Sequence, residues 1–520
     1  MLFHSPEFIL LFLPLAVIGY HAVREFGGMR AALGLLVLAS LVFYGWWDPR
    51  FIGLLLGSAA VNFILGRNLS ARHRQGKPSR SLLIFGIAIN LGLLGYFKYA
   101  DFFIGNINLA AGLDFTTLHI ALPLAISFFT FQQIAFLVDA HSGAAEDPDL
   151  LSYLLFVTFF PQLIAGPIVH HKEMMPQFAQ TTRDTHIWDD LAVGFTIFTI
   201  GLFKKTVIAD RMGFWSDRVF ESAALGAPVP LIEAWSGALA FTFQIYFDFS
   251  GYTDMAIGLA LMFGIRLPVN FASPYKATSI IDFWRRWHIT LSRFLRDYLY
   301  IPLGGNRNSP SRRYTNLLIV MLLGGLWHGA AWTFVLWGAL HGLYLVVNHL
   351  WRRLTGTHTT PSLAARWAGR CVTLLAVIVA WVVFRADSLD TAQSIYAGMI
   401  GLNGLVLPTH YFNALGSAGP MLENFGVVFG QTPLFGGGFQ LLWYGVVLAA
   451  VWFLPNSQSL LHKFHPVLSD TISETSGKLK ILTNMWRPNL ITGVATGVAA
   501  AILVLRQLQG TPGEFIYFQF

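Results

Sequence analysis

Long apolar runs separated by short polar connections follow one another along almost the whole chain, and they limit what it can fold into. A helix needs about 20 apolar residues to cross the roughly 30 Å hydrocarbon core of a bilayer. Soluble domains carry roughly 25% charged residues, whereas this chain of 520 residues carries 12% and is 55% hydrophobic. Because several runs are short or contain Gly or Pro, we predict an all-α polytopic membrane protein with about 11 to 13 membrane helices, some broken or re-entrant. The candidate spans lie near residues 7–23, 31–47, 51–66, 81–99, 118–138, 150–166, 190–209, 232–247, 251–265, 314–350, 368–385, 438–454 and 490–506.

The spacing of these runs also predicts the domain organisation. The spans follow one another too closely for separate soluble units, so residues 1–520 are predicted to form a single integral membrane domain. The stretch 401–437 is rich in Gly, Pro and Asn and is expected to be an ordered extramembrane loop, and 456–488 is a second polar excursion. The two halves show no repeat, which disfavours a secondary transporter.

The distribution of Lys and Arg predicts which loops face the cytoplasm, because cytoplasmic loops carry an excess of both residues. The segment 67–80 holds five Lys and Arg residues and no acidic one. Counting spans back from it places the start of the chain outside, and the loop 304–313 is expected inside. The start, MLFHSPEF, has no Lys or Arg before the first span, and no clear cleavage site follows, so this span is expected to be retained. The net charge of +7 is therefore attributed to cytoplasmic loops and does not indicate a nucleic-acid partner.

Several common catalytic and cofactor motifs are absent from the sequence. It contains no G-x-S-x-G, H-E-x-x-H, Walker A or G-x-G-x-x-G pattern, which excludes the usual hydrolase, zinc-protease and nucleotide-binding classes. The single cysteine, Cys371, excludes an internal disulfide and a Cys-rich zinc site, and its setting offers no paired base for a nucleophile. We expect no metal site and no permanently bound cofactor.

The apolar run 315–347 is too long for one membrane helix, which would extend about 50 Å. We expect it to break near 329–333, where Thr333 could cap the next helix. His328 then lies at a discontinuity within the membrane, where irregular backbone is tolerated only inside protein or beside a cavity. His341 occupies a second copy of the same G-x-x-H-G frame and is expected to lie mid-helix, bonded to a neighbouring helix. In a continuous helix the two imidazoles would be about 20 Å apart.

The segment 282–297 has the spacing of a basic amphipathic helix with an aromatic face. Trp284, Trp287 and His288 share that face, and most of the arginines fall on other faces. One interpretation is a cytoplasmic surface helix that meets anionic lipid. A second interpretation is that the guanidinium groups also hold the phosphates of an acyl carrier. The arginines concerned are Arg285, Arg286, Arg293 and Arg296.

Two carboxylates, Asp248 and Asp254, stand beside a predicted span. Paired carboxylates can carry out acid–base chemistry. Six positions apart on a helix, however, they point away from each other, so we expect them to organise polar contacts between helices.

Five long motifs in this sequence resemble the signature of the membrane-bound O-acyltransferase (MBOAT) family. The resemblance extends from about residue 1 to 400 and is closest to the bacterial polysaccharide branch, which includes alginate O-acetyltransferase and the D-alanyl transferase of teichoic acids. The motifs are FFPQLIAGPIVHH, YFDFSGYTDMAIGLALMFGI, FWRRWHITLSRFLRDYLYIPLGG, LLGGLWHGAAWTFVLWGALHG and VVFRADS.

The resemblance implies a fold around a central cavity and tunnel, through which an acyl group passes from a cytoplasmic thioester to an acceptor outside. It implies that His328 is the catalytic histidine and that His288 is a second catalytic position. It also implies that the protein lies in the bacterial inner membrane. The expected donor is acetyl-CoA or another acyl thioester, and the expected acceptor is an exopolysaccharide such as alginate or cellulose, reached through an extracytoplasmic partner protein. Imidazole titrates near neutral pH, so His328 suits the removal of a proton from the accepting hydroxyl. The expected tunnel-lining residues are Trp284, Trp287, Trp327 and Trp332.

Two other classes of function remain open from the residues alone. A polysaccharide exporter or channel would use the same intramembrane polar groups and need no acyl donor. A non-catalytic scaffold of a secretion complex would keep its function when His328 is replaced.

Overall fold

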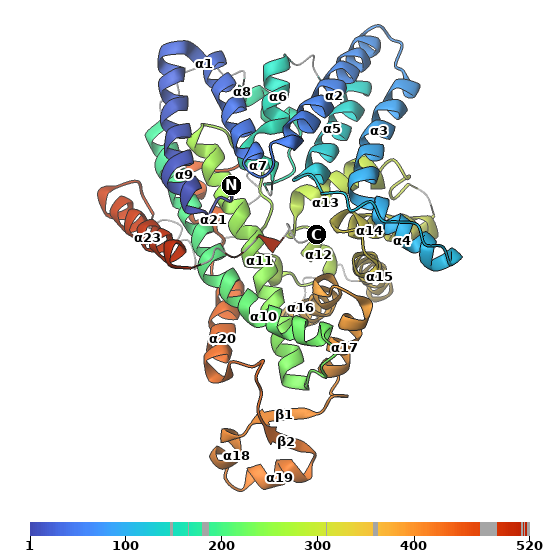
Figure 1. The fold of residues 1–520 in the computed structure, drawn as a ribbon, viewed down its shortest axis with the longest axis vertical. Helices are drawn as coiled ribbons and strands as arrows, with labels where there is room; N and C mark the ends of the chain where they lie inside the picture. Colours follow the sequence, from blue (N-terminus) through green and yellow to red (C-terminus); the bar gives the residue numbers. More distant parts are fainter. Residues whose placement is uncertain are drawn as a thin grey trace.

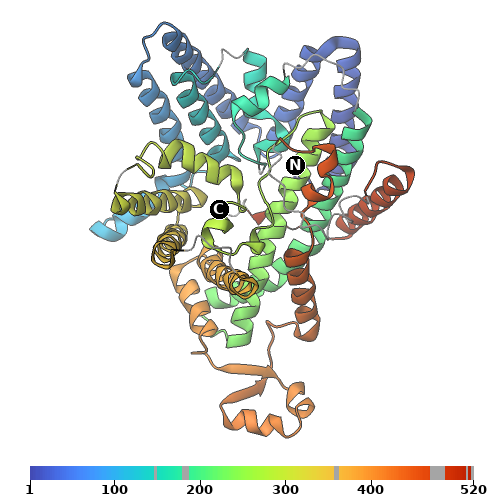
Figure 2. The same ribbon diagram turned by 180° about the vertical axis from the view of Figure 1, so that it is seen from behind.

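The computed structural model is helical apart from two short strands and shows how the predicted spans are arranged (Figures 1 and 2). It describes residues 1–145, 149–164, 166–178, 187–307, 309–356, 362–468, 486–510, 513, 515 and 516.

The first half of the chain supplies the helices that run along the length of the molecule. Helix α1 is kinked at Gly28, which has φ 81°. In chain order the elements are η1 (Phe8–Phe12), α1 (Leu13–Gly45), α2 (Arg50–Arg74), α3 (Arg80–Leu94), η2 (Gly95–Tyr99), α4 (Ala100–Ala111), α5 (Ile126–His141), α6 (Leu150–Thr158), α7 (Phe160–Leu163), α8 (His171–Phe178), α9 (Ile187–Phe203), η3 (Lys204–Ala209), α10 (Asp210–Ala224) and α11 (Leu231–Met262).

The second half supplies the motif-bearing helices and a small lobe at one end. In Figure 1, α15 and α16 are seen nearly end-on, so they cross the lengthwise helices steeply. The elements are η4 (Pro274–Lys276), α12 (Ile280–Trp284), α13 (Ile289–Leu295), η5 (Arg296–Tyr300), α14 (Pro310–His328), α15 (Trp332–Thr355), α16 (Leu363–Arg385), α17 (Leu389–Met399), β1 (Leu405–Pro408), α18 (His410–Ala414), α19 (Ala418–Asn424), β2 (Val427–Gly430), α20 (Gly437–Phe453), α21 (Ser457–Leu460), η6 (His462–Phe464) and α23 (Leu490–Gln509).

The all-α polytopic prediction is confirmed. Among the described residues, seven helices are long and apolar enough to cross a membrane, by length and composition. The prediction of about 11 to 13 membrane and re-entrant helices includes shorter elements that length cannot test, and it stays a prediction. The seven are Phe8–Gly45, Arg50–Arg74, Arg80–Ala111, Ile187–Ala224, Trp332–Thr355, Leu363–Arg385 and Leu490–Gln509.

Helix α11 is the centre of the core, and it corrects one sequence prediction. The predicted spans 232–247 and 251–265 are a single continuous helix, almost every residue of which is buried. Glycine in the YFDFSGYTD segment is a packing residue and not a break, because Gly251 lies against the backbone of Gly201 on α9, where a β-carbon would collide. Small residues allow this close approach of two helices in a membrane protein.

The carboxylates of α11 tie helices together, as the sequence predicted. Asp254 forms an ion pair with Lys204 at 2.6 Å, and Asp248 forms one with Lys205 at 2.8 Å. Both lysines come from η3, directly after α9. The four charges therefore neutralise one another inside the protein, as buried charges require.

Two other predicted spans are broken or shortened. The run 150–166 ends its first helix at Thr158 and turns at Phe159 before the short helix α7, so it is not one span. In the run 118–138 the helix starts only at Ile126, after residues without regular secondary structure.

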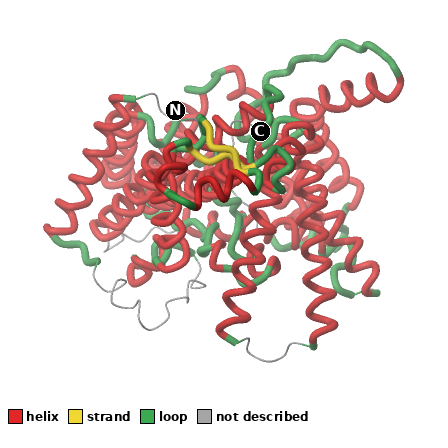
Figure 3. The backbone as a smooth tube through the Cα atoms, turned by 90° about the horizontal axis from the view of Figure 1, so that it is seen from below, coloured by secondary structure: helices red, strands yellow, loops and turns green. Residues whose placement is uncertain are grey.

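Residues 401–437 form an ordered lobe, as predicted. Strands β1 and β2 pair in parallel, with Leu405 opposite Val427, and α18 and α19 connect them. The lobe projects from one end of the molecule in Figure 1, and Figure 3 shows the strands in front of the helical body when viewed from that end. Most of the second predicted excursion, residues 469–485 within 456–488, lies outside the described residues.

The run 315–347 breaks where the sequence predicted, but the chain then turns back. Helices α14 and α15 pack antiparallel: Gly325 lies against Phe334 and Gly338, and Gly342 lies against Met321. Since Arg313 near the start of α14 contacts His349 near the end of α15, both outer ends of the pair lie together. The two helices form a hairpin whose tip lies at 329–331.

The hairpin and the positive-inside rule together predict which loops face the cytoplasm. In a variant lacking Cys371, single cysteines at Lys77 and Ser311 should resist membrane-impermeant thiol reagents in intact cells. A cysteine at Ser417 in the lobe should react, because the hairpin returns to the side on which it starts, and among the described residues α16 is then the only candidate span between the hairpin and the lobe. Labelling of all three after permeabilisation is the control. Ready labelling of Lys77Cys and Ser311Cys in intact cells would reverse the orientation.

Candidate active site

His328 is the last residue of α14 and stands at the tip of the hairpin. The chain leaves the helix in extended conformation at Gly329, where a β-carbon would collide with the Phe334 ring, so glycine is required. Helix α15 starts at Trp332 with Ala331 as its N-cap and without a side-chain cap bond, so the predicted cap by Thr333 is wrong.

The backbone carbonyls at this helix end are held by two side chains from η2. Lys98 Nζ donates to Trp327 O at 2.6 Å and to His328 O at 3.0 Å. Tyr99 OH donates to Leu326 O at 2.8 Å. The last carbonyls of a helix have no partner within the helix and carry partial negative charge, so a buried ammonium suits them. Lys98 and Tyr99 thereby fix the position of His328.

The His328 side chain is buried, with 5% of its surface exposed, among three aromatic rings. The centroids of Trp327, Trp337 and Phe384 lie 4.9, 5.1 and 5.2 Å from its own. His328 also lines a cavity of about 360 Å³, together with Lys98 and Trp327. The wall of this cavity includes residues 47, 48 and 51, at the end of α2 opposite to its basic end.

His288 lies in the turn between α12 and α13, and this corrects the sequence reading of 282–297. The segment is not one amphipathic surface helix: it breaks at His288, whose φ of 42° is left-handed. The imidazole is completely buried, and its Nδ1 lies 3.1 Å from Asn270 Oδ1. The inward position predicted for His288 is therefore right, although the element around it is different.

The structure brings the two candidate histidines to one tryptophan. The ring centroid of Trp327 lies 6.2 Å from that of His288 and 4.9 Å from that of His328. The side chains of His288 and His328 thus reach a shared buried region from the turn before α13 and from the end of α14.

His341 occupies a different environment. Its ring stacks on Phe283 and lies 4.8 Å from Trp337 between centroids, and neither ring nitrogen has a hydrogen-bond partner among the described residues. The expected bond to a neighbouring helix is therefore wrong. The chain reversal also removes the separation of a continuous helix, because His328 and His341 both contact Trp337.

The four arginines of the 282–297 segment have different surroundings. Arg286 bonds to Asp282 at 2.7 Å and to the Ala272 carbonyl, which ties α12 to the preceding loop, so the structure does not place it at a donor pocket. The other three line a cavity of about 550 Å³, together with Arg313 and His349. They are Arg285, Arg293 and Arg296.

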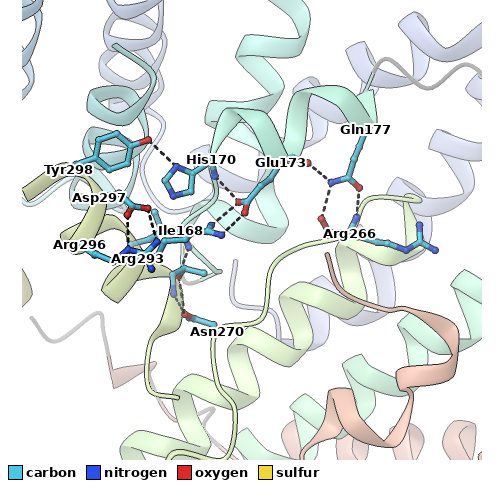
Figure 4. A network of polar contacts seen from close by, with 11 residues as sticks. Ile168, His170, Glu173, Gln177, Arg266, Asn270, Arg293, Arg296, Asp297 and Tyr298 are labelled. Atoms are coloured by element: carbon cyan, nitrogen blue, oxygen red, sulfur yellow. Dashed lines mark hydrogen bonds and ion pairs between the residues drawn. The ribbon is translucent and has the colours of Figure 1, made fainter. Parts of the chain in front are cut away.

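A network of polar contacts holds part of this cavity wall (Figure 4). Arg293 forms a two-point ion pair with Glu173 of α8, at 2.5 and 2.8 Å. His170 Nδ1 lies 3.1 Å from the Tyr298 hydroxyl, which donates to Asp139. Burial, with a contribution from Arg293, lowers the pKa of His170. The neutral ring donates from Nδ1, because the Tyr298 proton is already used.

Two of the four predicted tunnel tryptophans line the cavities described above, and two do not. Trp327 lines the cavity beside His328, and Trp284 lines the arginine cavity. Trp287 is buried against Phe283 and lines neither cavity. Trp332 is 53% exposed, donates to Asn106 on α4 and lines neither cavity.

Sequence reasoning missed Lys98, Tyr99, Asn270 and Arg313. A signal existed for Lys98, because it is the only charge in the apolar run 81–100, and ionisable groups in membrane segments are costly unless they have partners. Asn270 lies in a loop and had no such signal. Within the described part of the chain, no group of three His, Cys, Asp or Glu side chains is placed to hold a metal ion.

Comparison with known proteins assigns the chain to a family. The model of the membrane-bound O-acyltransferase family matches residues 140–386, which include His288 and His328. A peptidoglycan O-acetyltransferase of Helicobacter pylori is 46% identical over 437 residues, covering 78% of this chain and 81% of the relative. A probable alginate O-acetylase AlgI of Pseudomonas putida is 43% identical over 406 residues, covering 77% and 80%. The chain therefore belongs to the membrane-bound O-acyltransferase family.

Teichoic acid D-alanyltransferase of Streptococcus thermophilus is more distant, at 28% identity over 44% of this chain and 57% of the relative. These similarities define the protein as a multi-pass membrane O-acetyltransferase that uses an acyl donor and a polysaccharide acceptor.

Removing the Lys98 ammonium should weaken the tip of the hairpin. Lys98→Met leaves two buried carbonyls without their donor, and an unsatisfied buried polar group costs about 1–3 kcal/mol. We expect a lower melting temperature in detergent and a loss of acetyl transfer, both partly restored in Lys98→Arg. Lys77→Met, on the exposed basic loop, is the matched control. A Lys98→Met protein as stable and active as the parent would show that the tip does not need this bond.

Proposed function

We propose that this protein transfers an acetyl group from a cytoplasmic thioester to an exported or cell-envelope polysaccharide, with His328 as the general base. The observation that supports this most is the position of His328 at the tip of a membrane hairpin, beside a cavity. In the proposed reaction the imidazole of His328 takes the proton of the accepting hydroxyl. The hydroxyl oxygen attacks the carbonyl carbon of the thioester at the same time. The C–S bond breaks, and the thiol leaves with the proton. A neutral imidazole can accept this proton and pass it on to the leaving thiolate.

The cavity lined by arginines is the proposed entrance for the donor. Its wall carries Arg285, Arg296 and Arg313, and Arg285 and Arg296 are exposed to solvent. Its floor is apolar, with Leu317 and Met321 on the same helix as His328. A phosphate-bearing head with a thin apolar arm fits such a surface, because guanidinium groups bind phosphate oxygens in pairs. Acetyl-CoA has this chemistry, and so does a phosphopantetheine arm on a carrier protein.

The proposed acceptor is defined by class. The relatives in Helicobacter and Pseudomonas are named for peptidoglycan and alginate. Their sequence identities to this chain, 46% and 43%, are too close to each other to favour one polymer as the acceptor. Both polymers are polysaccharides outside the cytoplasm, and cellulose belongs to the same class. An extracytoplasmic partner that completes the transfer is part of the proposal, as is a bacterial inner membrane with the N-terminus outside.

Matched substitutions of the two G-x-x-H-G histidines test the assignment of the base. His328→Gln should abolish acetylation of the polymer at near-normal abundance in the membrane, because an amide cannot accept the hydroxyl proton. His341→Gln should retain substantial activity, because the His341 ring makes no hydrogen bond that the described residues show. The measurement is the acetyl content of purified polymer per amount of membrane protein.

Full acetylation with His328→Gln would show that His328 is not the general base. Complete loss in both variants at normal abundance would make His341 part of the site.

A donor series tests the arginine cavity. Arg285→Gln with Arg296→Gln should raise KM for acetyl-CoA about tenfold or more, since charge-assisted bonds contribute about 1.5–3 kcal/mol each. The same variant should use a short acetyl thioester without phosphates as well as the parent does. Arg72→Gln, on the exposed end of α2, is the control for loss of surface charge. Equal KM values for acetyl-CoA in parent and variant would place the donor elsewhere.

A further inference from the structure

The side chain of Asn270 is the centre of the contacts that hold the turn at His288. Its Oδ1 lies 3.1 Å from His288 Nδ1, 3.3 Å from Thr290 N and 2.9 Å from Thr290 Oγ1. Its backbone carbonyl accepts the N–H of Ile289 at 2.9 Å. Asn270 therefore contacts each residue from 288 to 290.

Hydrogen positions in this cluster follow from backbone groups whose roles are fixed. The N–H of Thr290 can only donate, so the Asn270 atom that faces it is the amide oxygen. Turning the amide over would place its NH₂ group against that N–H. The Thr290 hydroxyl accepts the N–H of Ile168 at 3.0 Å, so its own proton is directed to Asn270 Oδ1 (Figure 4).

The same reasoning fixes the imidazole. Asn270 Oδ1 has no hydrogen, so a bond to His288 Nδ1 requires that Nδ1 carries the hydrogen. In a neutral ring the lone pair is then on Nε2. His288 Nε2 is buried and has no hydrogen-bond partner among the described residues.

We propose that Asn270 is a positioning residue for the acyl transfer, which holds His288 as the Nδ1–H tautomer and leaves Nε2 as a hydrogen-bond and proton acceptor. The inference rests on the proposed function, because it assumes that His288 meets the reacting groups. It also deepens that function: neutral His288 accepts from a hydroxyl or thiol, and it cannot hold the thioester carbonyl by donating to it.

The conformation of His288 explains why the turn needs such support. Its φ of 42° lies in the left-handed region, which costs free energy for a residue other than glycine and persists only where neighbours enforce it. The Ile289 bond to the Asn270 backbone and the Thr290 bonds to its side chain act on the two residues that follow.

An amide also suits this position better than a carboxylate. Aspartate would accept the same hydrogen bonds, but its charge would favour the imidazolium, in which both ring nitrogens carry hydrogen. The proton-accepting atom would then be lost at neutral pH. The neutral Asn270 orients the ring without charging it.

The first experiment reads the tautomer without reference to activity. The full-length protein, labelled with ¹⁵N in its histidine rings and held in lipid nanodiscs, is measured by NMR, and His288→Gln identifies the signals of His288. We expect a protonated Nδ1 and a bare Nε2. A protonated Nε2 with a bare Nδ1 overturns the inference, whatever the activity. The expected tautomer together with full acetylation by His288→Gln would confirm the tautomer but overturn the role of Asn270 in the acyl transfer, while the role of His328 would stand.

The second experiment uses the pH profile of acetyl transfer from acetyl-CoA in membrane vesicles. Asn270→Asp should displace the profile toward alkaline pH by about 1–2 pH units, because the carboxylate stabilises the imidazolium. Asn270→Leu should lower activity at every pH without that displacement, and Thr290→Val should act in the same direction more weakly.

Controls separate positioning from general destabilisation. Asn62→Asp introduces a carboxylate at another buried asparagine, on α2, and should leave the position of the profile unchanged. Thr242→Val removes a buried hydroxyl that bonds only to its own helix, at Ala238. An unshifted profile for Asn270→Asp at normal abundance would contradict the role of Asn270.

Discussion

The position of His328 depends on hydrogen-bond donors for the carbonyl groups at the end of α14. A helix that ends inside an apolar environment leaves backbone acceptors that cost several kcal/mol each when they stay unsatisfied. Here Lys98 and Tyr99 supply the donors for residues 326 to 328. The helix can therefore end at His328 within an apolar environment. Without these donors, an end at this position would be too costly.

Two separate elements, the hairpin and the turn at His288, hold the two candidate histidines. Helix α14 delivers His328 next to one cavity, and its other residues form the floor of the second cavity. The turn after α12 brings His288, from a different part of the chain, to within 6.2 Å of Trp327 between ring centroids. Trp327 therefore lies within 6.2 Å of both imidazoles between ring centroids.

The sequence predicted the break at 329 because length alone forbids a single helix, and it predicted the buried face of 282–297 from periodicity. It could not predict that the chain turns back at the break. The second half of the run is equally apolar whether it continues across the membrane or returns as the second helix of a hairpin. The turn at His288 was hidden because Trp284, Trp287 and Leu291 keep helical spacing across it. The spans 232–247 and 251–265 were predicted as two and form one helix, since a glycine that permits contact with Gly201 looks the same in sequence as one that interrupts a helix. Asn270 acts through a fold that brings a loop to residues 288–290, and no local pattern records that.

The backbone contacts between α14 and α15 have a consequence for the motions that the site allows. Gly325 and Gly338 leave no side chain between the two helices, so they can neither slide nor separate without losing that packing. Transporters that rock between two states need interfaces that can slip. The α14–α15 pair is therefore built as a rigid unit that keeps His328 in one place at its tip.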